Sequence, residues 1–191
     1  MIVRNFVKMH HYETSNRPSI CVVDKFLSRN NFSDLSEFAE ECQYRYGEKD
    51  SGTQRPTGMT YDLLTEDTDE DDQEVIDLIH GKILEKFPEM EDYNLDRVYI
   101  NCFAPREIAN YHQDCDEPLD YVTFLLYANP VFKGLDEGGA TEFYLEEKII
   151  AIPPIPNTLV KFTGWIWHRA TPFNTDHRFT CLLYTSPSPR D

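Results

Sequence analysis

Arg97-Val-Tyr-Ile-Asn-Cys-Phe103 opens the part of the chain that decides the fold. The run is rich in β-branched and aromatic residues, which favour strands. Similar runs follow it, separated by Pro, Gly, Asn and Asp, at Tyr121-Val-Thr-Phe-Leu-Leu-Tyr127, Thr141-Glu-Phe-Tyr-Leu145, Thr158-Leu-Val-Lys-Phe162 and from Arg178 onward. Several short strands in succession predict a β-sandwich or a jelly roll.

The residues before these strands predict a further strand, a helix and a loop. Ile20-Cys-Val-Val-Asp-Lys-Phe-Leu27 predicts the strand. Asn31 or Ser33 is expected to cap the helix, whose apolar positions are Leu35, Phe38, Ala39 and Cys42. The polar stretch from Gly47 to Tyr61, which contains three glycines and a proline, is predicted to be loop.

A second helix is predicted between this loop and the strands. Pro88 ends a helical spacing of apolar residues that comprises Val75, Ile76, Ile79, Ile83, Leu84 and Phe87. We therefore expect a mainly β fold with flanking helices, namely a double-stranded β-helix (jelly roll) with two N-terminal helices packed on one sheet. With 191 residues, the chain has room for one domain, expected at 1–180, in which 1–94 support a jelly-roll core at 95–180.

The chain is strongly acidic, with a formal net charge of -16 from 18 Lys and Arg against 34 Asp and Glu. Nucleic-acid affinity depends on Lys and Arg that displace counterions from phosphates, so no nucleic-acid partner is expected. Much of the acid lies at residues 66–74, which we interpret as a solvated loop, with partner binding as the alternative. The sequence leaves the oligomeric state open.

Five scattered cysteines, without a C-x-x-C pair, suggest neither a disulfide framework nor a zinc knuckle. The N-terminal apolar stretch is too short for a signal peptide, and no segment has the apolar length of a membrane helix. A cytoplasmic location without membrane contact is therefore expected.

His112-Gln-Asp114 is the first candidate for a metal site. On an extended segment, side chains two residues apart point to the same face, so His112 and Asp114 can reach one ion together. Two imidazoles and one carboxylate on a single face leave the other positions open, as a non-haem Fe(II) oxygenase requires. The tripeptide alone is a weak signal, and the chemistry needs one more histidine.

His168 is the remaining candidate among the six histidines. It lies in the apolar stretch Phe162-Thr-Gly-Trp-Ile-Trp-His-Arg-Ala-Thr-Pro172, 54 residues after Asp114 and ten residues before Arg178. His177 would face away from Arg178 on a strand. The others are expected at surface or helix positions, and they are His10, His11 and His80. A core histidine is the alternative reading of His168.

These pieces together resemble the Fe(II)- and 2-oxoglutarate-dependent oxygenases, in particular their prolyl 4-hydroxylase-like branch. The matching segments are Tyr111-His-Gln-Asp114, Glu137-Gly-Gly-Ala-Thr-Glu-Phe143, Asn157-Thr-Leu-Val-Lys-Phe162, Trp167-His-Arg-Ala-Thr-Pro172 and His177-Arg-Phe-Thr180. The resemblance is strong from about Leu95 to Thr180 and faint before that.

The resemblance implies that His112, Asp114 and His168 bind Fe(II). It also implies that Arg178 pairs with the distal carboxylate of 2-oxoglutarate, a task suited to a bidentate guanidinium, and that Thr180 donates a hydrogen bond to that carboxylate. A surface cation is the alternative for Arg178. Members of the branch often have a tyrosine near the position of Phe103, so Tyr99 or Tyr111 is expected to replace it as a contact to 2-oxoglutarate.

The implied reaction is hydroxylation of a substrate C–H bond by dioxygen, with 2-oxoglutarate converted to succinate and carbon dioxide and with ascorbate as a candidate reductant. The closest resemblance favours a peptidyl proline as substrate, and a small metabolite is the alternative. Another alternative is a jelly-roll binding module whose His and Asp are structural or hold zinc.

Aromatic residues near strand ends are expected to be core or rim packing, with a substrate cleft as the alternative, and they are Tyr127, Trp165 and Trp167. Small acidic oxygenases of this kind are similar to those of bacteria and viruses, so the cytoplasm of a bacterium or of a virus-infected host cell is expected.

The last eleven residues, Cys181-Leu-Leu-Tyr-Thr-Ser-Pro-Ser-Pro-Arg-Asp191, differ in character from the strand before them. They resemble the translation of transposon-end and adapter DNA used in sequencing libraries. We expect 181–191 to be a non-native tail, although Leu182 and Leu183 could still pair with a neighbouring strand. A natural Ser-Pro terminus is the alternative.

Overall fold

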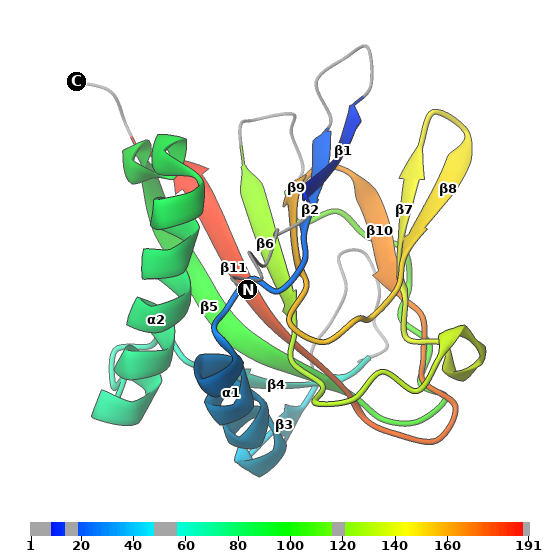
Figure 1. Ribbon diagram of the computed structural model, residues 1–191, viewed down its shortest axis with the longest axis horizontal. Helices are drawn as coiled ribbons and strands as arrows, with labels where there is room; N and C mark the ends of the chain where they lie inside the picture. The colour runs from blue at the N-terminus through cyan, green and yellow to red at the C-terminus, as the bar shows by residue number, and fades with distance from the viewer. Residues whose placement is uncertain (1–8, 14–18, 48–56, 116–120, 189–191) are drawn as a thin grey trace, which may run out of the picture.

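The computed structural model describes residues 9–13, 19–47, 57–115 and 121–188. In these residues the chain forms two β-sheets and two α-helices (Figure 1). The large sheet has the strand order β1-β2-β9-β6-β11-β5-β4-β3, and the small sheet has the order β10-β7-β8. The predicted mainly β jelly roll with flanking helices is confirmed.

Neighbouring strands of the large sheet are antiparallel throughout. Its strands are β1 (Met9–Glu13), β2 (Ser19–Val23), β3 (Arg45–Tyr46), β4 (Met59–Asp62), β5 (Tyr93–Phe103), β6 (Val122–Tyr127), β9 (Leu159–Thr163) and β11 (Arg178–Pro187). The small sheet contains β7 (Thr141–Leu145), β8 (Lys148–Ile152) and β10 (Trp167–Ala170).

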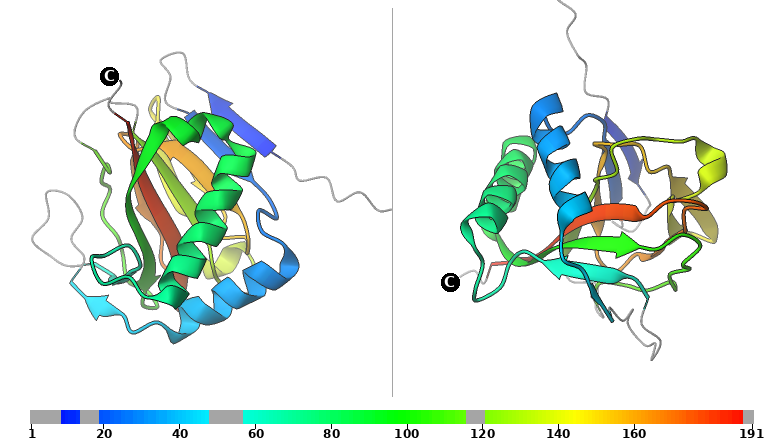
Figure 2. Two further views of the ribbon diagram at one scale, coloured as in Figure 1. Left: turned by 90° about the vertical axis from the view of Figure 1, so that its left-hand side faces the viewer. Right: turned by 90° about the horizontal axis from the view of Figure 1, so that it is seen from below.

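Both helices cover the same face of the large sheet, opposite the small sheet (Figures 1 and 2). They are α1 (Arg29–Glu41) and α2 (Glu70–Lys86), and a short 3₁₀ helix at Pro88–Asp92 follows α2. Alternation along the strands buries Val98, Ile100, Phe124 and Leu126 in one apolar cluster with helix residues such as Ile79 and Ile83. The predicted packing of the helices on one sheet is confirmed.

The start of α1 differs from the prediction. Ser28 is the N-cap, and its hydroxyl accepts a hydrogen bond from the Asn31 amide at 3.2 Å. The predicted caps Asn31 and Ser33 lie inside the helix instead. Ser28 takes the role because a hydroxyl can satisfy a free amide of the first turn as well as an asparagine can.

No helix in the described ranges is long and apolar enough to cross a membrane.

Several strands were not predicted. Part of the expected loop at 47–61 forms β4, which pairs with β5, while 48–56 lie outside the described residues. Strands β7 and β8 are joined by Glu146 and Glu147, both with positive φ (46° and 63°). A two-residue hairpin turn of this conformation usually contains Asn or Gly, so two glutamates carry no turn signal.

The opposite face of the large sheet meets the small sheet. Their facing side chains form a second apolar cluster that includes Leu125, Tyr127, Phe143, Phe162 and Ile152. The space between the sheets is therefore filled over much of its extent by apolar side chains, and polar residues line the remaining part.

Strand β11 continues through the segment that resembles adapter sequence. Residues 181–187 pair with β5, and the pairing with β6 continues to Thr185. Leu182 and Leu183 are buried. Backbone hydrogen bonds in a ladder do not depend on side-chain identity, so this pairing does not distinguish a native strand from an accidental one. The foreign origin of the segment and the boundary at Thr180 stay predictions.

Candidate active site

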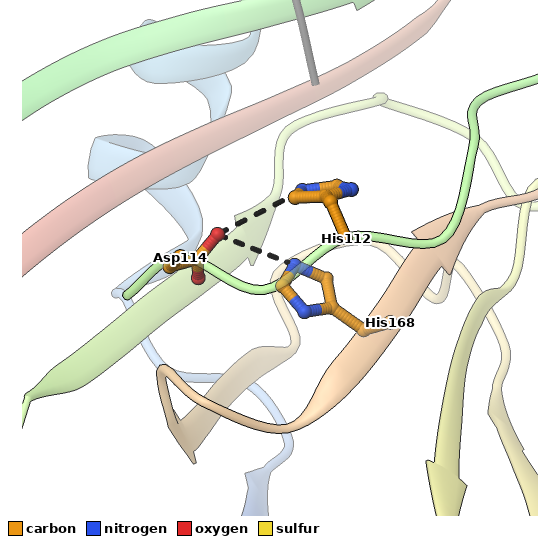
Figure 3. A group of neighbouring side chains, drawn as sticks. All are labelled: His112, Asp114 and His168. Carbon is orange, nitrogen blue, oxygen red and sulfur yellow. Dashed lines mark ion pairs between the residues drawn. The ribbon is translucent and has the colours of Figure 1, made fainter. Parts of the chain in front are cut away.

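The three predicted metal ligands come from two segments that the backbone ties together. His112 lies after β5 and forms an isolated bridge with His168 of β10, through amide-to-carbonyl bonds of 3.0 and 2.9 Å. The Asp114 amide donates to the Gly164 carbonyl at 2.8 Å. As a result the three side chains converge (Figure 3).

The ligand atoms of these side chains all lie within 4.8 Å of one another. Asp114 Oδ1 is 3.7 Å from His112 Nε2 and 3.6 Å from His168 Nε2. Nδ1 of His112 is 3.1 Å from the Asn110 carbonyl, and Nδ1 of His168 is 2.8 Å from the Ile166 carbonyl. A carbonyl can only accept, so each Nδ1 carries a proton, and in the neutral ring the Nε2 lone pair faces the centre.

The environment of these ligands is partly apolar. His168 is 3% exposed, and its ring contacts Phe162 and Phe143 at centroid distances of 4.8 and 5.8 Å. The Asp114 carboxylate accepts from Thr123 Oγ1 on Oδ2 at 2.6 Å and from the Tyr184 hydroxyl on Oδ1 at 3.2 Å. The donor set of two imidazoles and one carboxylate therefore fits a divalent transition metal such as Fe(II).

A cavity of about 230 Å³ extends from the three ligands to Arg178. Large-sheet residues form most of its wall, and those before the suspected tail are Arg97, Tyr99, Asn101, Phe103, Leu125, Arg178 and Thr180. Thr141 of the small sheet lies in the wall as well. The cavity thus joins the metal ligands to a cationic site.

Arg178 is fully buried at 1% exposure, and its hydrogen bonds to the described residues go to neutral groups. Its Nε donates to the Gly139 carbonyl at 2.8 Å, and its Nη2 donates to Thr141 Oγ1 at 2.8 Å. Among the described residues no carboxylate forms an ion pair with it, and desolvation lowers the pKa of the guanidinium. A buried cation with neutral partners favours an anionic ligand, and a carboxylate matches the guanidinium geometry.

The Gly138-Gly139 pair explains how Arg178 is held. Both residues have positive φ, 85° and 79°. A Cβ on Gly138 would lie 2.3 Å from the Pro172 carbonyl oxygen, and a Cβ on Gly139 would lie 2.1 Å from the Phe173 ring. Only glycine allows this close approach, which places the Gly139 carbonyl against Arg178.

The structure brings most of the predicted co-substrate residues to the cavity. Thr180 is completely buried, and its Oγ1 lies 3.4 Å from Arg178 Nη1. Tyr99 lines the cavity, and its hydroxyl is 2.7 Å from that of Tyr184. Tyr111 is not brought there: its hydroxyl donates to Glu142 at 2.9 Å.

Three further polar residues contact Arg178 or Asp114 and were not predicted to do so, and they are Tyr127, Thr141 and Thr123. The fully buried Tyr127 hydroxyl bonds Thr141 Oγ1 at 2.7 Å, and Arg178 lies 5.4 Å from the ring centroid. Thr123 is the third, through its bond to Asp114. The available signal was the alternation along β6, which places Thr123 and Tyr127 on one face. Trp167 is exposed, and the Trp165 carbonyl accepts from the Gln113 side chain.

Neither a family model nor a curated protein matches the chain. Solved structures do match. A prolyl hydroxylase from Trichoplax adhaerens, in complex with a hypoxia-inducible factor peptide fragment, aligns at a TM-score of 0.71 and 18% identity, over 88% of this chain and 83% of the other. A prolyl 4-hydroxylase from Pseudomonas putida aligns at 0.64 and 16%, over 88% and 92%.

A viral collagen prolyl hydroxylase from Paramecium bursaria Chlorella virus-1, in a 2-oxoglutarate complex, aligns at a TM-score of 0.63 and 20% identity, over 90% of this chain and 96% of the other. At these identities the likeness establishes the fold, and this chain has the fold of the 2-oxoglutarate Fe(II) oxygenases.

Proposed function

We propose that this chain is an Fe(II)- and 2-oxoglutarate-dependent dioxygenase that hydroxylates a substrate C–H bond. One observation carries the proposal: a His-Asp-His donor set and a buried Arg178, which pairs with no carboxylate of the described residues, lie on the same cavity. The similarity of the fold to prolyl hydroxylases supports the proposal.

His112 and His168 would hold the metal through Nε2, and Asp114 would hold it through Oδ1. This set leaves positions open for other ligands, as Fe(II) oxygenases require. A structural zinc site would need a fourth protein ligand, and the group found in the described residues has three members. The donor set therefore favours an enzyme over a zinc-binding module.

Fe(II) together with 2-oxoglutarate and dioxygen supplies oxidative decarboxylation, which yields succinate, carbon dioxide and a hydroxylated substrate. The side chains of the protein would bind and orient the metal and the co-substrate. Arg178 would pair with the distal carboxylate of the co-substrate, and the hydroxyls of Thr180 and Thr141 lie against the same guanidinium. Phe143 and Phe162 exclude water from the buried side of His168.

For the substrate, we propose a proline in a peptide. The solved structures with this fold include prolyl hydroxylases, one of them bound to a peptide fragment. A small metabolite is the second candidate, because loops rather than the shared strand core select the substrate.

Anaerobic titration with Fe(II) and 2-oxoglutarate tests the metal and co-substrate sites. We expect a metal-to-ligand absorption band in the wild-type chain and its loss in His168→Ala. His177→Ala is the matched control, because His177 is exposed and lies one residue from Arg178 without being a ligand. A band that persists in His168→Ala, or that is absent from the wild type, would refute the proposal.

Succinate release then tests the substrate class. We expect proline-containing peptides to stimulate it more than free proline or small metabolites, with ascorbate present in one arm and absent from the other. Stimulation by small metabolites alone would contradict the peptide assignment and leave the proposed chemistry intact.

A further inference from the structure

Asp114 is held by a contact that the proposed chemistry does not by itself explain. Its side chain is 4% exposed, and Oδ2 accepts from Thr123 Oγ1 at 2.6 Å. Thr123 is 2% exposed, so water does not compete for this bond. A short hydroxyl-to-carboxylate bond in a buried site belongs to the stronger class of hydrogen bonds.

The two oxygens of this carboxylate face different partners. Oδ1 lies 3.7 and 3.6 Å from the two imidazole Nε2 atoms, whereas Oδ2 faces Thr123. The hydroxyl therefore determines which oxygen faces the metal position. Without a donor, Oδ2 would be buried and unpaired, or the carboxylate would turn both oxygens toward a cation.

The position of Thr123 follows from the sheet. Strand β6 pairs with β9, and Thr123 lies opposite Phe162 in that register. The alternation of β6 directs Thr123 and Leu125 to the face that lines the site. Thr123 therefore acts from a central strand of the large sheet on a ligand that lies outside any strand.

Building on the proposed function, we infer that Thr123 is a positioning residue for the metal site. Its hydroxyl engages Oδ2, and this leaves Oδ1 as the single ligand oxygen of Asp114. Groups that orient a metal ligand typically contribute about 10–100-fold to metal affinity. The other hydroxyl on this carboxylate comes from Tyr184, inside the suspected foreign segment, whereas Thr123 lies in the segment that resembles the oxygenases.

The test compares Thr123→Val, which removes the donor at nearly equal volume, with Thr123→Ser, which retains it. Fe(II) affinity is measured by competition with a coloured chelator, without 2-oxoglutarate. We expect Thr123→Val to bind Fe(II) about 10–100-fold more weakly. Thr123→Ser should remain close to the wild type.

Thr158→Val is the matched control. Thr158 is also 2% exposed and precedes a strand, but its Oγ1 has no hydrogen-bond partner among the described residues. This variant should leave Fe(II) affinity unchanged. If Thr123→Val does not fold, Thr123→Ala replaces it in the same comparison with Thr123→Ser.

Equal Fe(II) affinity in Thr123→Val and the wild type would overturn the inference, as would an equal loss in Thr123→Ser. This readout is separate from the proposed function. If the wild-type chain binds Fe(II) but shows no absorption band with 2-oxoglutarate, the proposed function fails while the chelator competition still tests Thr123.

Discussion

The two ends of the cavity carry side chains of opposite chemistry. At one end, two imidazole nitrogens and a carboxylate converge, a donor set that suits a divalent cation. At the other end, Arg178 lies buried on β11 in the middle of the large sheet and pairs with no carboxylate of the described residues. The first end therefore suits a metal ion and the second suits a carboxylate, so the cavity suits a molecule that chelates a metal with one terminus and carries a carboxylate at the other.

Replacing Arg178 tests this contrast with the largest expected effect. Arg178→Gln should weaken 2-oxoglutarate binding about 10²–10³-fold, the equivalent of about 3–4 kcal/mol, because it leaves a buried carboxylate unpaired. Fe(II) affinity should not change, since Arg178 does not contact the three ligands. Isothermal titration of 2-oxoglutarate into the Fe(II) form measures the loss.

The same variant should also raise the free energy of unfolding of the ligand-free chain, because it removes a buried charge that no carboxylate of the described residues neutralises. Arg169→Gln is the control: Arg169 forms a partly exposed ion pair with Glu142 and should change either quantity little. Unchanged 2-oxoglutarate affinity in Arg178→Gln would show that the two ends do not serve one ligand.

Gly139→Ala tests the arginine end of the cavity through the backbone, because the Gly139 carbonyl accepts a hydrogen bond from Arg178. It should lower the free energy of unfolding by about 2–4 kcal/mol, because alanine is strained at positive φ and its Cβ overlaps the Phe173 ring. Gly81→Ala in α2 is the matched control, since its added Cβ meets no atom within 4 Å. The control should gain up to about 1 kcal/mol.

Urea unfolding measures both glycine variants. In Gly139→Ala, 2-oxoglutarate affinity should fall as well, because the displaced carbonyl no longer accepts from Arg178 Nε. An alanine variant as stable as the wild type would mean that the Gly-Gly segment has no special backbone requirement.

Tyr184→Phe should have the smallest effect, and it concerns the metal end. The Tyr184 hydroxyl is 3.2 Å from Asp114 Oδ1, a long distance for a hydroxyl donor, and Oδ1 would be occupied by the metal. We expect Fe(II) affinity to change by about threefold or less. A loss as large as that of Thr123→Val would argue that the segment belongs to the site.

The source DNA tests the origin of this segment directly. If 181–191 are translated adapter, a longer genomic clone should encode different residues after Thr180. An uninterrupted genomic reading frame that encodes the same eleven residues would contradict the adapter origin of 181–191.

The sequence predicted the residues whose chemistry is carried by order and spacing. His112, Asp114, His168 and Arg178 fall in this group because their order and spacing resemble those of the oxygenases. The structure brings these four side chains to one cavity, and their roles stay predictions. Thr123 and Tyr127 were harder to assign, since their roles depend on which side chains face them across the sheets. Local periodicity does not give that register.

Other differences between the predicted and the observed structure concern a helix cap, a hairpin turn and a pair of tyrosines. The Ser28 cap was missed because Asn31 and Ser33 are equally good cap residues in composition. The β7–β8 hairpin was missed because its turn consists of two glutamates. Tyr99 and Tyr111 could not be separated by sequence, since only the tertiary structure places Tyr99 in the cavity wall and Tyr111 beside Glu142.

The backbone bridge between His112 and His168 arranges the candidate metal ligands without a metal. Two amide-to-carbonyl bonds join the segments that carry these ligands, and neither bond involves a metal. The coordinating atoms are therefore held near one another before any ion arrives. If the chain binds Fe(II) as proposed, removal of the metal should leave this arrangement in place, and the metal-free chain should rebind Fe(II) without refolding.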